Sequence, residues 1–386
     1  MVDEKFGSDE LNPGVVVLFG SGETSPSGRK VFDHLLHSLP QAPRIRLLET
    51  PAGFELNSDR VIGKVGEFIE HHLQNFQPEV AVVPARKRGT DFSPDDEMIA
   101  SQLLDADLIF MGPGSPSYAV RQLQDSLAWN YLMARHRLGA ALVLASAAAI
   151  AISTYALPVY EIYKVGEDPH WKKGLDLFGA YGLPLVFIPH WNNQDGGDEL
   201  DTSRCFMGQS RFEALMEQLP PDLTVMGIDE KTALILDQHA GEARVMGQGG
   251  VTLLHTGHRH DFSKENPVSP TLLQVARQRR GHVHQYRSGD VFPLSDCCPF
   301  DDPIPEPGIP ADIWERAWQV HQELQKVEQI DPAEEAPQAV WDLVEARQQA
   351  REQKQWQLAD ELRAQIAAQG WQVLDTPDGP KLEKIG

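Results

Sequence analysis

The first half of the chain alternates short, entirely apolar runs with segments in which apolar residues recur every three or four positions. Apolar runs of this kind are typical of strands covered on both faces, and the segments between them have the period of amphipathic helices. The pattern predicts an α/β fold of three layers, in which helices cover both faces of a mostly parallel sheet. The predicted strands are VVVLF (15–19), RIRLLET (44–50), EVAVVPA (79–85), DLIFMG (107–112) and ALVLAS (141–146).

The second half begins with one more run of this type, LPLVFIPH (183–190). Further short runs then follow in close succession, separated by turn-forming residues such as QHAG and QGG, a spacing typical of antiparallel strands. We therefore expect them to extend the sheet in antiparallel fashion. These runs are TVMGID (224–229), TALILD (232–237), EARVMG (242–247) and VTLLHTG (251–257).

A segment rich in proline and acidic residues, CCPFDDPIPEPGIP (297–310), follows the α/β part. It cannot form a helix or a central strand, because proline lacks the backbone N–H. We expect it to link an α/β domain (1–296) to a small helical C-terminal domain (311–386). That domain is predicted to hold one long helix over 338–369, ended by Gly370, and a closing hairpin around an Asp-Gly turn.

Composition and charge narrow the classes of function. The 386 residues are 41% hydrophobic and 23% charged, as in folded soluble proteins. The formal net charge of -22 repels nucleic acid and anionic lipid, so nucleic acid is not expected as the main partner. No apolar run is long enough for a membrane span, and the acidic start MVDEKFGSDE lacks the features of a secretion signal. We expect a cytoplasmic protein with no membrane partner, and self-association into a homo-oligomer stays open.

The distribution of cysteine and histidine predicts neither a metal nor a cofactor. Cys205 stands alone, Cys297 and Cys298 are adjacent, and no CxxC spacing occurs. Neither a disulfide framework nor a zinc site is therefore indicated. The histidines of LHTGHRH (254–260) match no defined set of ligand spacings, and a polar loop is favoured there.

Ser146 stands between an apolar run and the small residues AAAIA (147–151), which predict the start of a helix. A serine on a sharp strand-to-helix turn is exposed at the sheet edge. The next N–H, that of Ala147, then points at the charge that develops on a substrate oxygen. A serine is also a common end of a core strand, so both interpretations stay open on this feature alone.

Polar groups that suit a serine nucleophile follow the neighbouring predicted strands. His190 suits a general base, and Glu230 is an acid that suits the orientation of an imidazole. In GPGSPS (112–117), Pro113 has no N–H, which makes Gly114 the second candidate oxyanion donor. Such strand ends meet at one edge of an open α/β sheet, where sites form. The alternatives are a backbone-capping role for His190 and a surface ion pair for Glu230.

Six motifs between about residues 14 and 257 occur in the same order as in a known protein family. They are GSGE (20–23), DLIFMGPGSPSYAVRQL (107–123), ASAAA (145–149), IPHW (188–191), RCFMGQSRFEAL (204–215) and GIDEKTALIL (227–236). Together they resemble the cyanophycinase and dipeptidase E family of serine peptidases. The resemblance implies the class I glutamine amidotransferase-like fold and a hydrolase that acts on a small peptide or amide through an acyl-enzyme.

The resemblance also implies roles for individual residues. Ser146 corresponds to the nucleophile, His190 to the general base, Glu230 to the acid and Gly114 to the oxyanion loop of that family. Arginines that follow the histidine bind substrate in the family. The similar positions here are Arg204 and Arg211.

The chain departs from the family pattern at the elbow itself. The family has glycine two residues before and two after the serine, where strand and helix backbones come close. This chain has Leu144 and Ala148 there. Side chains at these positions crowd a serine with positive φ, so we expect the elbow to be harder to form. The loop 192–201 is also long and acidic compared with the family. A non-catalytic relative that binds a ligand or a partner is therefore the alternative function.

The C-terminal region carries a second resemblance. The segment ARQQAREQKQWQLADELRAQIAAQGWQVLDTPDG (346–379) is similar to the C-terminal end of bacterial cysteinyl-tRNA synthetase. No HIGH or KMSKS signature occurs, so a synthetase is not expected. A tRNA contact stays open, although the mixed charges favour a protein contact. The apolar stripe of the predicted helix comprises Trp341, Val344, Ala350, Trp356, Ala359, Leu362 and Ile366.

Overall fold

The computed structural model describes residues 12–256, 283–297, 308–330, 337–352, 355–376 and 379–384. Most of the predicted linker lies outside these ranges, as do His258 and His260. The chain forms two compact units, Met1–His321 and Gln322–Gly386. The boundary between them falls inside helix α9 (Ala311–Ile330), because Ile313, Trp314 and Ala317 belong to the core of the larger unit.

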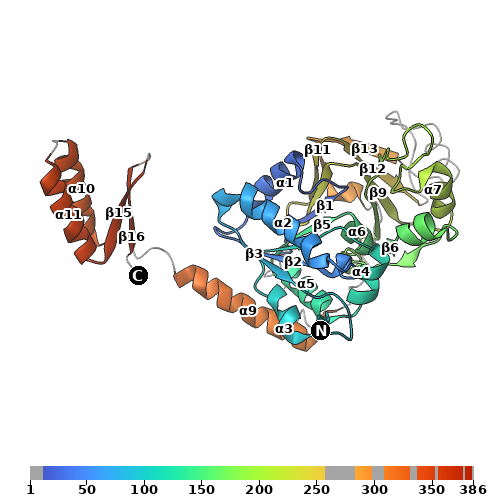
Figure 1. The fold of residues 1–386 in the computed structure, drawn as a ribbon, viewed down its shortest axis with the longest axis horizontal. Coiled ribbons are helices and arrows are strands. Elements are labelled where there is room, and N and C mark those ends of the chain that lie inside the picture. Colours follow the sequence, from blue (N-terminus) through green and yellow to red (C-terminus); the bar gives the residue numbers. More distant parts are fainter. Residues whose placement is uncertain are drawn as a thin grey trace. The chain divides into compact units, whose positions relative to one another are not determined.

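The larger unit is built on an eight-stranded sheet in the order β14-β11-β10-β1-β5-β4-β2-β3 (Figure 1). The strands from β3 to β1 in this order pair in parallel, and β10, β11 and β14 are antiparallel to their neighbours. All the strands predicted before residue 150 are therefore confirmed. Their bounds are β1 (Val16–Phe19), β2 (Arg44–Leu48), β3 (Glu79–Val83), β4 (Leu108–Met111), β5 (Ala141–Ala145), β10 (Thr232–Asp237), β11 (Glu242–Gly247) and β14 (Val291–Pro293).

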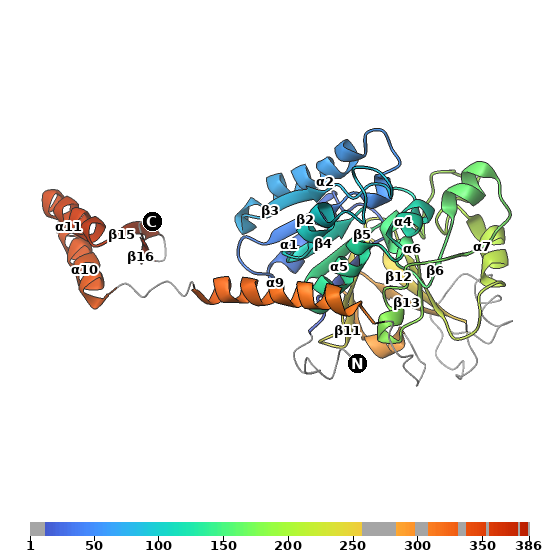
Figure 2. The same cartoon turned by 90° about the horizontal axis from the view of Figure 1, so that it is seen from below.

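Alternate residues of the central strands face opposite helix layers, as an apolar strand covered on both sides requires. In β1, Val17 and Phe19 pack with α1 and α2, whereas Val16 and Leu18 pack with the layer of α3 to α6. Figure 2 shows α2 on one side of these strands and α5 on the other. The three-layer α/β prediction is confirmed. The helices are α1 (Pro26–Leu36), α2 (Ser58–His72), α3 (Glu97–Ala100), α4 (Pro116–Leu123), α5 (Leu127–Arg137) and α6 (Ala147–Ala151).

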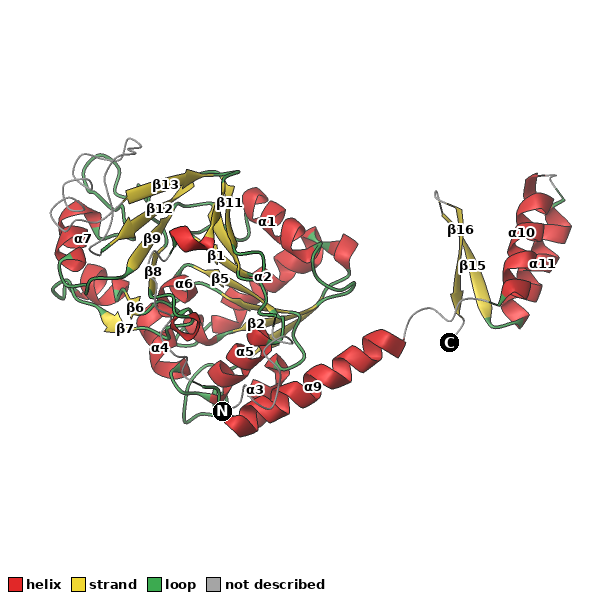
Figure 3. Cartoon of the chain, turned by 180° about the vertical axis from the view of Figure 1, so that it is seen from behind, coloured by secondary structure: helices red, strands yellow, loops and turns green. Residues whose placement is uncertain are grey.

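A second sheet, in the order β13-β12-β9-β8, lies beside the first (Figure 3). The predicted antiparallel extension of the main sheet is confirmed for β10 and β11 and wrong for β9 and β12, because the chain changes sheet between β9 and β10 and again at a glycine turn after β11. Gly247 has a φ of +135°, and a Cβ there would lie 2.3 Å from the carbonyl oxygen of Lys231. The elements of this part are β6 (Tyr155–Ala156), β7 (Lys172–Lys173), β8 (Leu185–Ile188), α7 (Gly208–Met216), β9 (Thr224–Ile228), β12 (Gly250–His255) and β13 (Val283–Arg287).

The smaller unit packs two helices and a hairpin around a core of its own. Val340, Val344 and Ile366 from the helices pack with Trp371 and Val373 from the hairpin. The predicted hairpin is confirmed, and its turn residues 377–378 lie outside the described residues. The elements are α10 (Gln338–Glu352), α11 (Trp356–Ala368), β15 (Trp371–Thr376) and β16 (Gly379–Lys384).

The prediction of one long helix over 338–369 is wrong, since α10 and α11 are separate helices that pack against each other. Ala350 of α10 contacts Ala359 and Leu362 of α11 in a small apolar cluster. Two short helices that pack together can bury as much apolar surface as one long amphipathic helix. Their apolar residues recur with the same period, so the sequence pattern does not distinguish the two arrangements. The predicted end is confirmed, because Gly370 follows α11 with a φ of +83°.

No helix in the described part of the chain combines the length and the apolar character needed to cross a bilayer. Cys205 and Cys297 are buried and form no disulfide within the described structure, and Cys298 lies outside the described residues.

Candidate active site

Ser146 sits at the sharp turn between β5 and α6. Its φ is +52° and its ψ is -109°, a conformation that a residue with a Cβ rarely adopts. Leu144 and Ala148 do not prevent this turn, contrary to the expectation from the missing glycines. Both side chains are fully buried in the core between the sheet and the α3 to α6 layer, so they point away from the exposed face of the serine.

A chain of hydrogen bonds links the three predicted catalytic side chains. Ser146 Oγ lies 3.0 Å from His190 Nε2, and His190 Nδ1 lies 2.9 Å from Glu230 Oε1. An imidazole with its proton on Nδ1 fits both contacts, because it donates to the carboxylate and accepts from the hydroxyl. Asn193 Nδ2 donates to the same carboxylate oxygen at 2.9 Å. Asn193 was not predicted from the sequence, where its only signal is its place three residues after His190.

The turn that follows β1 connects the backbones of these three positions. The Ser146 N–H donates to Phe19 O at 3.2 Å, and the His190 N–H donates to Gly20 O at 3.1 Å. The Lys231 N–H, next to Glu230, donates to Ser21 Oγ at 3.2 Å. Residues 19–21, which include the start of the GSGE motif, therefore hold the ends of β5, β8 and β9 in register.

Gly114 occupies a backbone position that excludes any side chain. Its φ is +150°, and a Cβ there would lie 1.9 Å from the carbonyl oxygen of Pro51. The Ser115 N–H donates to the same oxygen at 2.9 Å. Among the described residues, the N–H groups of Gly114 and Ala147 have no hydrogen-bond acceptor. Helices α4 and α6, which begin after these two turns, pack against each other.

Of the two predicted substrate arginines, only Arg204 lies beside this constellation. The Arg204 N–H donates to Trp191 O at 2.8 Å, and the next N–H, that of Cys205, donates to His190 O at 3.1 Å. The Arg204 guanidinium lies 5.5 Å from the Trp191 ring centre. Burial lowers the pKa of Arg204, and the carboxylate of Asp201 opposes this effect. Arg211 is exposed on α7, with no contact to Ser146, His190 or Glu230 in the described structure.

Arg204, Cys205 and Phe206 have consecutive positive φ values of +56°, +57° and +67°. This left-handed turn could not be predicted from the sequence, because none of the three residues is glycine. The turn places the Phe206 ring 6.0 Å from the His190 ring and 5.2 Å from the Tyr163 ring. It also buries the thiol of Cys205, and burial, with a smaller effect of Glu230, raises the pKa of Cys205 to about 12. Cys205 is therefore neutral and does not compete with Ser146 as a nucleophile.

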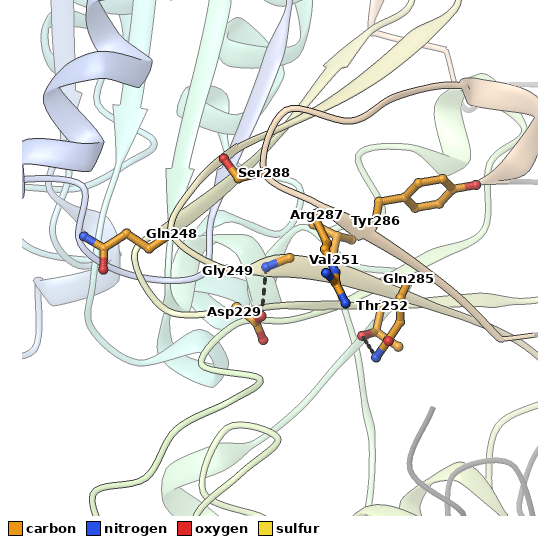
Figure 4. A pocket seen from close by; sticks show the side chains of 10 residues that line it. Asp229, Gln248, Gly249, Val251, Thr252, Gln285, Tyr286, Arg287 and Ser288 are labelled. Atoms are coloured by element: carbon orange, nitrogen blue, oxygen red, sulfur yellow. Dashed lines mark hydrogen bonds between the residues drawn. The ribbon is translucent and has the colours of Figure 1, made fainter. Parts of the chain in front are cut away.

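The two neighbouring acids Asp229 and Glu230 face different surroundings. Asp229 accepts the Gly250 N–H at 2.8 Å and lines a separate hollow of about 450 Å³ formed with β12 and β13 (Figure 4). Burial raises the pKa of Asp229, the Gly250 N–H opposes this, and the charge of Glu230 adds to it. Of these two acids, Glu230 is the one that bonds His190.

The described residues contain no cluster of three or more side chains suited to a metal ion. In the histidine-rich segment, His255 Nδ1 pairs instead with Thr224 Oγ1 at 2.9 Å.

Comparison with known proteins defines the class of fold. No family model matches the chain. The crystal structure of a peptidase from an acI-B1 Actinobacterium aligns with a TM-score of 0.54 and 20% sequence identity, and the match covers 74% of this chain and 98% of that one. The chain therefore shares its α/β fold with a peptidase.

A second comparison concerns a short segment. The cysteine–tRNA ligase of Caldicellulosiruptor saccharolyticus is 47% identical over 60 residues, which are 15% of this chain and 13% of that protein. The ligase of Chlamydia felis is 40% identical over 57 residues, 12% of its length. The chain thus spans only about an eighth of the length of the curated relatives it matches.

Proposed function

We propose that the larger unit is a serine hydrolase that cleaves a small peptide or amide through an acyl-enzyme. The observation that carries the proposal is the contact of 3.0 Å between Ser146 Oγ and His190 Nε2, on a serine with positive φ, backed by the contact of 2.9 Å from His190 to Glu230. A hydroxyl becomes an effective nucleophile when a positioned base accepts its proton.

The proposed reaction has two halves. Ser146 Oγ attacks the substrate carbonyl carbon while its proton passes to His190 Nε2, and Glu230 stabilises the resulting imidazolium. The N–H groups of Gly114 and Ala147 bind the oxyanion. The intermediate then collapses, and the leaving amine takes the proton from Nε2. A water molecule then attacks the carbonyl carbon of the acyl-enzyme while its proton passes to His190 Nε2. Collapse of this second intermediate returns the proton to Ser146 Oγ and releases the acid product.

The substrate side of the proposal rests on Arg204. Its Nε is buried and has no hydrogen-bond partner among the described residues, and its backbone N–H donates to the carbonyl of Trp191, next to His190. An anionic group of a short peptide is the natural partner of a partly buried guanidinium. Arg211, which is exposed on α7, is proposed only as a secondary contact.

A fluorophosphonate probe tests the proposal without knowledge of the substrate. We expect one covalent adduct per chain, which peptide mass spectrometry assigns to Ser146. Ser146→Ala should remove the adduct, and Ser115→Ala is the matched control that should keep it. A folded protein that forms no adduct would leave the alternative, a non-catalytic binding protein, as the better account.

We also propose that the C-terminal unit binds a partner, because its segment 346–379 resembles the C-terminal end of cysteinyl-tRNA synthetase and the chain matches a cysteine–tRNA ligase at 47% identity over 60 residues. Gel-shift titration with tRNA at low salt and at about 0.2 M salt tests whether the partner is tRNA or a protein, since contacts to phosphate weaken steeply with salt. We expect no complex that survives the higher salt.

A further inference from the structure

A second hollow, with a volume of about 470 Å³, lies between α1 and β11 of the main sheet. Helix α1 packs against this strand (Figure 3). The turn after β11 (247–248) and the turn between β13 and β14 (288–289) complete the walls. Gln248 and Ser288 also line the neighbouring hollow of Asp229 (Figure 4). Of the described residues that line the second hollow, none belongs to the candidate active site.

The alternation of side chains along β11 turns Arg244 toward α1. Ala243 and Val245 are buried in the core between the sheet and the α3 to α6 layer. Met246 instead packs with the cluster that includes the apolar residues of α1. Successive side chains of a strand point to opposite faces of the sheet, so the half-buried Arg244 shares the face that α1 covers and lines the hollow.

One side of α1 adds two more basic residues to the same hollow. Ser27, Lys30 and His34 all line it, and their spacing of three and then four residues places them on one side of the helix. The first turn of α1 has no acidic residue, and no acidic residue is found among the described residues that line the hollow. The chain as a whole has 56 acidic residues against 34 lysines and arginines, so this surface is an exception to its negative charge.

The two permanent cations of the hollow have no carboxylate partner. Within the described structure, no ion pair or side-chain hydrogen bond joins Lys30 or Arg244 to another group. The half-exposed Asp33 of α1 lies 3.8 Å from His37 Nδ1 instead. A guanidinium without a carboxylate keeps its fork of N–H donors available for an anion. Elsewhere in the larger unit, carboxylates pair with Arg44, Arg46, Arg86 and Arg88.

Neutral donors and an apolar wall narrow the chemistry of the ligand. The Ser288 hydroxyl accepts the Gly247 N–H at 3.1 Å, so its own proton is available for a donated hydrogen bond. Cationic and hydroxyl donors on several sides of one space suit the acceptor oxygens of a phosphate group. The hollow is larger than a phosphate ion, and Pro26 and Met246 line it as well. Its volume is in the range of pockets that hold small organic molecules, about 300–1,000 Å³.

We propose that this hollow binds the phosphate group of a small phosphorylated molecule and is a second ligand site, separate from the candidate active site. Arg244 and Lys30 bind the phosphate oxygens, and the Ser288 hydroxyl donates to one of them. The side chains of Pro26 and Met246 contact the carbon part of the ligand. Binding involves no covalent step and does not depend on the proposed hydrolase.

Calorimetric titration of the full chain tests the proposal with three probes: inorganic phosphate, glycerol 3-phosphate and glycerol. At about 50 mM salt, where exposed charges are only partly screened, we expect each phosphate to bind once per chain and glycerol not to bind. Glycerol 3-phosphate should bind about three- to tenfold more tightly than inorganic phosphate, since its carbon part also loses contact with water. Equal or weaker binding of glycerol 3-phosphate would overturn the organic ligand and assign the hollow to the free ion.

Three variants locate the bound phosphate. Lys30→Gln and Arg244→Gln should each weaken the binding of glycerol 3-phosphate by about fivefold or more, because each removes a charged donor. Arg29→Gln is the matched control, since Arg29 is the exposed neighbour of Lys30 on α1 and does not line the hollow. It should change the affinity by less than about twofold. Circular dichroism shows whether each variant is folded, and the exposed Lys30 tests the site even if Arg244→Gln fails to fold.

The other outcomes contradict the proposal in different ways. A wild-type chain that binds neither phosphate has no such site. An equal loss of affinity in Arg29→Gln would mean general attraction to a basic surface. Binding that is kept in Lys30→Gln and Arg244→Gln but lost in Arg204→Gln would place the phosphate in the candidate active site. Ser146→Ala should bind phosphate like the wild type, so the outcome of this test is independent of the fluorophosphonate test.

Discussion

The strand ends that form the candidate site differ from the C-terminal unit in the backbone conformation of their residues. Around the site, Ser146, His190, Arg204, Cys205 and Phe206 all have positive φ, which costs a residue with a side chain about 1 kcal/mol or more. In the described part of the C-terminal unit only Gly370 has positive φ, and glycine adopts it readily.

This contrast shows that backbone strain is concentrated at the candidate site and absent from the described side-chain-bearing residues of the C-terminal unit. Strained residues persist only where surrounding contacts hold them, and they gather at functional sites. At the site the contacts are backbone hydrogen bonds from residues distant in sequence, such as the His190 N–H to Gly20 O. The C-terminal unit has regular helices and a hairpin, so its role is expected to lie in its surface.

The largest expected effect comes from His190. His190→Ala removes the base and should slow fluorophosphonate labelling by about a thousandfold or more. Glu230→Gln should slow it less, and the double variant should be no slower than His190→Ala, because the carboxylate acts through the imidazole. His34→Ala, an exposed histidine of α1, is the control. Additive losses would contradict the proposed triad.

The next effect concerns Gly114. Gly114→Ala forces a Cβ into the Pro51 carbonyl oxygen at 1.9 Å, on a backbone with a φ of +150°. We expect the free energy of unfolding to fall by about 2–4 kcal/mol, with loss of labelling beyond that explained by unfolding. Gly89→Ala is the matched control, since Gly89 has a φ of +73° but nothing within 4 Å, and it should cost only about 1 kcal/mol. Equal costs would mean that the Pro51 loop moves freely.

The difference between regions also explains what the sequence predicts well. Strands such as 107–112 and 141–146 were predictable because a strand covered on both faces is apolar throughout. Ser146, His190 and Glu230 were predicted as polar groups at the ends of apolar strands, but they do not meet at the edge of one sheet, because β5 lies in the main sheet and β8 and β9 lie in the second. Their contacts depend on how these strands are arranged in space, which the order of the motifs along the chain indicated.

Other features were not predictable, because tertiary contacts rather than local sequence determine them. The left-handed turn at 204–206 is held by the backbone carbonyls of His190 and Trp191, and its residues carry no local preference for positive φ. The reversal between α10 and α11 leaves the helical period unchanged, which is why one helix was predicted.

A third prediction concerns the stability of the C-terminal unit. In the predicted apolar stripe, Ile366 is fully buried whereas Trp356 is 60% exposed, because the stripe is split between two helices. Ile366→Ala should destabilise the unit by about 2–4 kcal/mol, and Trp356→Ala by less than about 0.5 kcal/mol. Urea unfolding followed by circular dichroism measures both. A large loss from Trp356→Ala would show that a further surface covers it.

The smallest expected effect is a gain of stability in Glu23→Gln. Because burial raises the pKa of Glu23 above its ordinary value of 4.5, the unfolded chain releases this proton at lower pH than the folded one. The folded state therefore loses stability as the pH rises from that value through the raised pKa of Glu23. Glutamine stays neutral over this window, so the variant should be as stable as the wild type at about pH 4 and more stable at about pH 8. Urea midpoints at the two pH values test this, with Asp33→Asn as the control. A loss of stability near pH 8 would contradict this expectation and would mean that the carboxylate has a structural partner in the fold.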